Sequence, residues 1–134
     1  ELKTAVECDS VAKIIAEELL SMDIHHNFAP VLDVSPNNEA ITNRTFGNDS
    51  ATVVEFSSAF VKATQEKQVV ATVKHFPGHG LVSGDTHHRL VTIDGALKEV
   101  NNYHPLIDQG VISVMVGHIA IVNNEKYNIC MYFK

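Results

Sequence analysis

The sequence has few cysteines, no long apolar run and no block of basic residues, and each shortage excludes a class of protein. Its two cysteines, Cys8 and Cys130, lie near opposite ends of the 134-residue chain. Two distant cysteines do not make a disulfide framework, so we expect free thiols, a reducing compartment and a cytoplasmic location. No apolar run reaches the ~18 residues of a membrane-spanning helix, so we expect no membrane span.

The sequence contains no basic segment followed by an apolar stretch, which is the pattern of a secretory signal. The chain begins at Glu1 and not at methionine, which suggests an internal start and leaves room for a signal upstream. Positive charge is also scarce. The formal net charge is -6 and the isoelectric point is about 5.7, which argues against nucleic acid as a partner. With 45% hydrophobic and 19% charged residues, the composition is that of a globular domain.

Apolar periodicity predicts three helices. Residues 2–22 and about 50–67 carry apolar side chains near helical spacing, and Asp49 or Ser50 could cap the second helix. A shorter helix is expected over 95–109, followed by a glycine.

Three continuously apolar runs, at 26–34, 69–74 and 111–117, predict strands. Because helices separate them, they indicate a parallel sheet covered on both faces. Polar residues follow the strands, where active sites lie in barrels and in open α/β sheets. A complete barrel needs roughly 250 residues. The chain is therefore predicted to be α/β, either a partial (β/α)8 TIM barrel of about three central βα units or a small open domain.

The segment KHFPGHGLVSGDTHH, residues 74–88, holds the densest group of reactive side chains. Asp85 and His87 are two residues apart, so an extended loop would place both on one side. A carboxylate beside an imidazole fixes its orientation and favours its protonated form, which makes His87 a candidate proton donor and acceptor. A solvated polar loop is the alternative. Gly78 and Gly80 predict a turn that lets the backbone approach a ligand.

A zinc site built from His75, His79, Asp85 and His87 is a further alternative. Pro77 interrupts the helical spacing of the first two histidines, so the prediction is that the chain holds no metal. His79 is expected to stabilise the loop. Asp33, at the end of the first strand, could be catalytic or could serve as a strand-end capping group.

These residues carry a resemblance. The run KHFPGHG, then four residues, then Asp85-Thr86-His87 is similar to the signature of family 3 glycoside hydrolases, in their β-N-acetylglucosaminidase branch. FAPVLDV (28–34) and NRTFGND (43–49) resemble two further stretches of that family. The resemblance covers roughly residues 5 to 121. It implies a central part of the barrel domain over 1–121 and a tail of uncertain structure over 122–134.

The resemblance also implies roles. His87 would be the acid/base that protonates the glycosidic oxygen, and Asp85 would orient it. Four residues would bind the sugar: Arg44, Lys74, His75 and His118, the last of which could instead pack below the pocket. The family retains anomeric configuration through a covalent intermediate, with an aspartate nucleophile on a later strand. The carboxylates after His87 do not stand in that context: Asp94, Glu99, Asp108 and Glu125.

The implied substrate is a carbohydrate with terminal β-linked N-acetylglucosamine, from cell-wall sugars such as those of peptidoglycan recycling or from chitin. No cofactor is implied. Because the nucleophile is missing, we expect the isolated chain to be inactive. A non-catalytic remnant of the barrel is the alternative.

Overall fold

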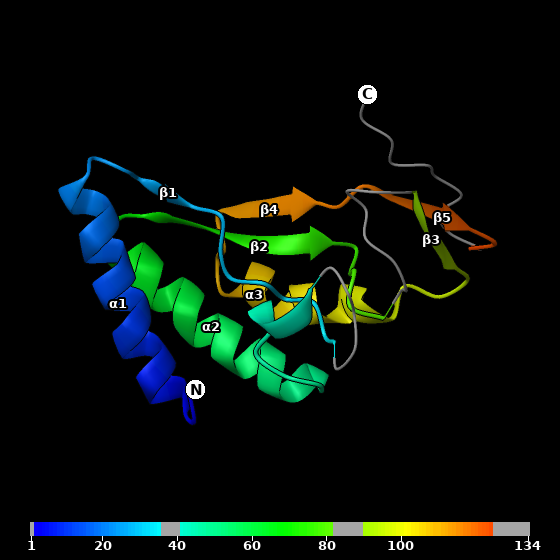
Figure 1. The fold of residues 1–134 in the computed structure, drawn as a ribbon, viewed down its shortest axis with the longest axis horizontal. Helices are drawn as coiled ribbons and strands as arrows, with labels where there is room; N and C mark the ends of the chain where they lie inside the picture. The colour runs from blue at the N-terminus through cyan, green and yellow to red at the C-terminus, as the bar shows by residue number, and fades with distance from the viewer. Residues whose placement is uncertain (1, 36–40, 82–89, 125–134) are drawn as a thin grey trace.

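The computed structural model describes residues 2–35, 41–81 and 90–124. Two long helices pack together on one side of a small parallel sheet, and a separate pair of strands lies beyond the ends of that sheet (Figure 1). No helix among the described residues is long and apolar enough to cross a membrane.

The two long helices form where the apolar periodicity predicted them. Helix α1 spans Ala5–Ser21 and helix α2 spans Ser50–Glu66. The Thr4 hydroxyl caps α1, and the Asp49 carboxylate caps α2 by accepting a 2.9 Å hydrogen bond from the Thr52 N–H. A side-chain acceptor satisfies an N–H group that has no partner within the helix. Of the two candidate caps for the second helix, Asp49 is therefore the one used.

The helices α1 and α2 share a small apolar core. Cys8 and Ala12 of α1 are fully buried and pack against Phe56 and Phe60 of α2. The Cys8 thiol donates to the Phe56 carbonyl oxygen at 3.4 Å, and burial raises the pKa of Cys8 to about 11. Cys8 is a free thiol, as expected, and its raised pKa makes it unreactive.

The main sheet is parallel throughout, which confirms the prediction. Its order is β1-β2-β4, with β1 at His26–Asn27, β2 at Val70–Phe76 and β4 at Ser113–Val116. Helix α1 comes before β1 in the chain, α2 comes between β1 and β2, and α3 comes before β4. The polar residues predicted at strand ends therefore gather at one end of the sheet.

The first strand was predicted too long. Over 26–34 only β1 and a single bridge from Val31 to Lys74 pair with β2. Pro30 interrupts the run because proline has no N–H to donate to a neighbouring strand. The end of the run is nevertheless buried, since Leu32 and Asp33 have no exposed surface.

A second pair of parallel strands was not predicted. Strand β3 spans Val91–Asp94 and pairs with β5 at Ile119–Val122. Figure 1 shows the pair beyond the carboxyl ends of β2 and β4. Strand β2 contains the first three residues of the segment KHFPGHG, and the tail expected over 122–134 begins at the last residue of β5.

The third predicted helix is present in two parts. A 3-10 helix, η2, spans Lys98–Asn102 and continues into α3 at Tyr103–Asp108. Gly110 ends the helix as predicted, with a φ of 94° and its N–H bonded to the Ile107 carbonyl at 2.9 Å. Tyr103 and Leu106 are buried against α2 and β2 residues such as Val61 and Val73. This packing fixes η2 close to the carboxyl ends of the sheet.

Candidate functional site

A buried carboxylate organises the carboxyl end of the sheet. Asp33 has no exposed surface and accepts hydrogen bonds from three groups on the chain that ends β2. The His75 Nδ1 lies 2.7 Å from Asp33 Oδ2, the His75 N–H lies 3.2 Å from both carboxylate oxygens, and the His79 N–H lies 2.7 Å from Oδ1. Because an ionised carboxylate only accepts, the proton on His75 is placed on Nδ1 and Nε2 is left for other contacts. The geometry thus supports the structural role of Asp33 over a catalytic one.

Strand β2 kinks where the site begins. The pairing with β4 shifts register between Lys74 and Phe76, so that His75 is an extra residue. An extra residue in one strand redirects its side chain. His75 consequently faces Asp33, while Lys74 lines a pocket of about 380 Å³ together with Arg44.

Lys74 and Arg44 form the cationic part of that pocket. The pKa of Lys74 is lowered, mainly by burial and then by the positive charge of Arg44, while Asp33 opposes the shift. The remaining lining is largely apolar and includes Phe28, Val31 and Phe46. Both cations carry only hydrogen-bond donors, so this corner suits a ligand rich in hydroxyl or carbonyl oxygens.

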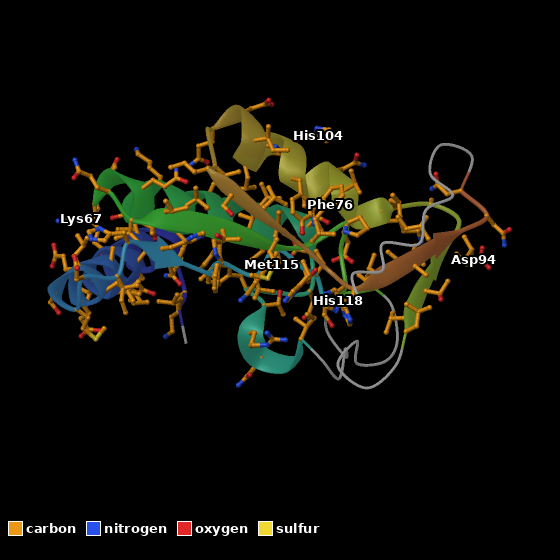
Figure 2. All side chains as sticks on the ribbon, turned by 90° about the horizontal axis from the view of Figure 1, so that it is seen from above. Lys67, Phe76, Asp94, His104, Met115 and His118 are labelled. Carbon is orange, nitrogen blue, oxygen red and sulfur yellow. The ribbon has the colours of Figure 1, made fainter. Side chains whose placement is uncertain are left out.

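His118 lies at the same end of the sheet as His75. It follows β4, its side chain is exposed, and Figure 2 shows it near the carboxyl end of that strand. The neighbouring Gly117 is close to His75: a Cβ atom at position 117 would lie 3.3 Å from the His75 Cβ. Lys74, His75 and His118 therefore lie at the carboxyl ends of β2 and β4, and Arg44, the last residue of a 3-10 helix (η1, Thr42–Arg44), lines the same pocket as Lys74.

The proposed acid/base pair, Asp85 and His87, lies outside the described residues, so its geometry stays a prediction. The same holds for the zinc alternative that uses both residues. Over residues 2–35, 41–81 and 90–124, no three His, Cys, Asp or Glu side chains are grouped to hold a metal ion.

The glycines of the segment KHFPGHG lie close to protein atoms, and whether the same turn approaches a ligand stays a prediction. A Cβ atom at Gly80 would lie 2.0 Å from the Val34 carbonyl oxygen, and one at Gly78 would lie 2.3 Å from the Glu99 Cβ. Gly78 also has a φ of 121°, a conformation that other residues rarely adopt. Both glycines therefore let the chain after β2 pack directly against its neighbours.

Replacing Gly80 with alanine is expected to destabilise the chain by about 3 kcal/mol, at the upper end for overpacking, because the new methyl group meets backbone atoms that cannot rotate away. Gly47→Ala is the matched control, since its Cβ would meet only the Thr52 side chain, at 3.3 Å. Urea unfolding measures both variants. A Gly80→Ala loss no larger than that of Gly47→Ala would contradict the packing role.

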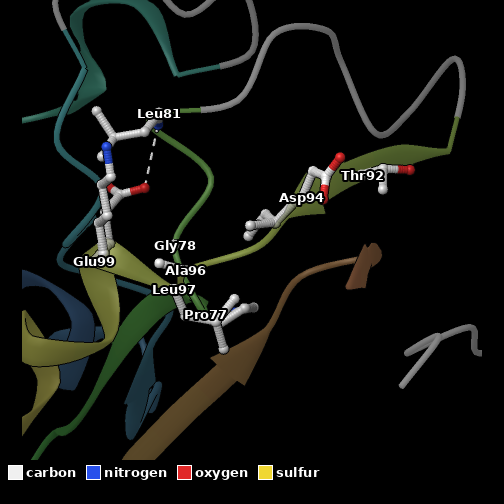
Figure 3. Close-up of a pocket in the computed structure, with 10 residues that line it drawn as sticks. Pro77, Gly78, Leu81, Thr92, Asp94, Ala96, Leu97 and Glu99 are labelled. Atoms are coloured by element: carbon white, nitrogen blue, oxygen red, sulfur yellow. Dashed lines mark hydrogen bonds between the residues drawn. The ribbon is translucent and has the colours of Figure 1, made fainter. Parts of the chain in front are cut away.

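Glu99 also lies at this site, and the sequence did not predict it. It was considered there only as a carboxylate that does not match the family's nucleophile. It is 4% exposed and lines a second pocket, of about 350 Å³, with Gly78, Leu81 and Asp94 (Figure 3). The sequence does contain a pattern that indicates burial of Glu99. Glu99 precedes the buried Tyr103 and Leu106 by four and seven residues, which is the spacing of one helical face.

Comparison with known proteins extends these observations. The model of the glycosyl hydrolase family 3 N-terminal domain matches residues 2–127. The chain is 33% identical over 127 residues to the β-hexosaminidase LpqI of Mycobacterium tuberculosis, covering 90% of this chain and 33% of that protein. It is 46% identical over 74 residues to a β-hexosaminidase of Vibrio cholerae, covering 55% of this chain and 22% of that protein.

Solved structures agree. A family 3 β-N-acetylglucosaminidase from Paenibacillus superimposes with a TM-score of 0.87 at 35% identity, covering 95% of this chain and 26% of that one. NagZ from Neisseria gonorrhoeae, in complex with N-trifluoroacetyl-D-glucosamine, superimposes with a TM-score of 0.82 at 28% identity, covering 89% and 37%.

The α/β arrangement described above is thus part of a TIM barrel, as predicted. The chain spans about a third of the length of the curated relatives it matches. With a family model that covers nearly all of its residues, the chain belongs to the glycosyl hydrolase family 3, as part of its N-terminal domain.

Proposed function

We propose that this chain carries the acid/base and sugar-binding part of a retaining glycosidase that removes terminal β-linked N-acetylglucosamine. The observation that carries the proposal is the cluster at the strand ends, where Asp33 holds His75 next to Lys74. Relatives named as β-hexosaminidases and a β-N-acetylglucosaminidase support the substrate class. Peptidoglycan fragments or chitin oligomers are the proposed sources of the sugar.

The proposed mechanism divides the work between two groups of residues. Arg44, Lys74, His75 and His118 donate hydrogen bonds to sugar oxygens and fix the ring. His87 protonates the leaving oxygen and then takes a proton from water, while Asp85 orients its imidazole. The nucleophile that forms the covalent intermediate is supplied by a part of the barrel that this chain does not contain. The cytoplasmic location stays a prediction.

Substrate discrimination tests the proposal. The full polypeptide encoded by the gene that contains this chain is expected to release 4-nitrophenol from its N-acetyl-β-glucosaminide much faster than from the corresponding β-glucoside. Retained anomeric configuration in the first product, followed by NMR, is expected from the two-step route. Faster cleavage of the β-glucoside, or an inverted product, would contradict the proposal.

The 134-residue chain alone is expected to show no turnover of the same N-acetyl-β-glucosaminide, because no covalent intermediate can form without the nucleophile. Discontinuous assays over hours would detect slow hydrolysis. Turnover that disappears on His87→Ala would show that the isolated chain is catalytically complete and would contradict the assignment of the nucleophile to another segment.

A further inference from the structure

The carboxylate of Glu99 binds three backbone N–H groups from two separate segments. Its Oε1 accepts from Val34 at 2.6 Å, and its Oε2 accepts from Gly80 at 3.0 Å and from Leu81 at 3.2 Å. Figure 3 shows the contact with Leu81. A side chain from η2 thus joins the chain that follows β1 to the chain that follows β2.

The positions of these donors relate Glu99 to the site. Val34 comes directly after Asp33, whose carboxylate holds His75. Gly80 and Leu81 are the last described residues before Asp85 and His87 in the sequence. The close approaches at Gly78 and Gly80 bring these segments against Glu99 and Val34 without a methyl group between them.

We propose that Glu99 is a positioning residue: by binding Val34, Gly80 and Leu81 it fixes the chain that comes directly before Asp85 and His87 in the sequence. The proposal rests on the function proposed above and adds a residue outside the segment KHFPGHG to the machinery. Glu99 does not touch the sugar. It acts through the backbone N–H groups of Val34, Gly80 and Leu81.

The electrostatic surroundings make this contact sensitive to pH. Burial raises the pKa of Glu99 to about 7, and the charge of Asp33 adds to the effect, while the three N–H donors oppose it. Asp33 and Tyr103 interact electrostatically with Glu99, and Asp94 and Lys98 line the same pocket. A proton on Oε2 would compete with the N–H groups of Gly80 and Leu81, so the ionised form is the one that binds all three donors.

Ionisation of Glu99 lowers the stability of the folded chain. Because the pKa of folded Glu99 lies above its ordinary value of 4.5, its contribution to stability is present below about pH 4.5 and is lost as the pH rises to about 7. The Glu99→Gln variant should lose this part of the pH dependence. Asp94→Asn, which alters an exposed carboxylate on β3 lining the same pocket, is the matched control and should keep it.

The first measurement follows backbone amides by NMR in the 134-residue chain from about pH 5 to about pH 9. The amide shifts of Val34, Gly80 and Leu81 are expected to titrate together with a midpoint near 7. In Glu99→Gln this common transition should vanish, and amide exchange at Gly80 and Leu81 should quicken on the order of tenfold, the equivalent of one lost hydrogen bond. The wild-type titration needs no variant, so a folding defect in Glu99→Gln leaves the test intact.

The second measurement uses the full polypeptide and the N-acetyl-β-glucosaminide. Glu99→Gln is expected to lower kcat by about 10- to 100-fold with little change in KM, as for a misplaced catalytic group, and to alter the acid side of the pH profile. Asp94→Asn should leave both unchanged. Wild-type kinetics in Glu99→Gln, or separate midpoints for the three amides, would overturn the inference. If the wild-type polypeptide hydrolyses no N-acetylglucosaminide, the proposed function fails, and the amide titration still decides whether Glu99 anchors these segments.

Discussion

Replacing His87 with alanine in the full polypeptide is expected to lower kcat/KM for an N-acetyl-β-glucosaminide by about 10²- to 10⁴-fold, the usual contribution of a general acid or base. The proposed role requires that His87 donate a proton as the glycosidic bond breaks. Most of the loss should therefore fall in kcat, because the residues proposed to bind the ring are left intact.

The leaving group provides a sharper test of this role. Nitrophenolate leaves without a proton, whereas the alkoxide of a second sugar needs one, so the loss in His87→Ala should be larger for a disaccharide than for the nitrophenyl glycoside. Asp85→Asn should show the same pattern to a smaller degree, since it disturbs only the orientation of the imidazole. His104→Ala, an exposed histidine on α3, is the control. An equal loss with both leaving groups would rule out His87 as the acid.

Replacing Asp33 with alanine is expected to destabilise the 134-residue chain by about 3–5 kcal/mol, because three donors lose a buried acceptor and each such loss costs about 1–3 kcal/mol. The substitution leaves the N–H groups of His75 and His79 and the Nδ1 of His75 without their acceptor. Asp33→Asn should cost less but still substantially, because its amide group replaces one acceptor oxygen by a donor.

Urea unfolding followed by circular dichroism measures this loss, with Asp94→Asn as the control for removing an exposed carboxylate. In the full polypeptide, Asp33→Asn should also raise KM, because His75 would no longer be held in one orientation toward the sugar. A loss of stability below about 1 kcal/mol, the net worth of one ordinary hydrogen bond, would contradict the organising role of Asp33.

The sequence predicted the long helices well and the short strands poorly, for physical reasons. Helices α1 and α2 repeat their apolar spacing over 17 residues each, so the signal is strong. Strands β3 and β5 have four residues each and pair across 28 positions of sequence, from Val91 to Ile119. So short a run carries no period, and its partner is fixed by tertiary contacts alone.

The place of Lys74 and His75 in the fold was predictable from their motif, whereas the contacts of Glu99 depend on packing. Lys74 and His75 stand in the segment KHFPGHG, and the structure places both at the expected strand end. Glu99 stands in no motif, and its partner Val34 lies 65 residues away. The close contacts of Gly78 and Gly80 could not be predicted either, because a sequence shows the conformational freedom of a glycine but not the atoms that surround it.

The parallel pairing of the main sheet has a consequence for the order of events during synthesis. Strand β1 is made before its partner β2, which begins at Val70, so the β1–β2 pair cannot form until that residue has left the ribosome. Asp33 likewise waits for His75, and Val34 waits for Glu99. Among the contacts of the described residues, the one between α1 and α2 can form earlier, because both helices are complete at Glu66. We therefore expect the helical pair to form first on the ribosome, and the site to assemble only after η2 has emerged.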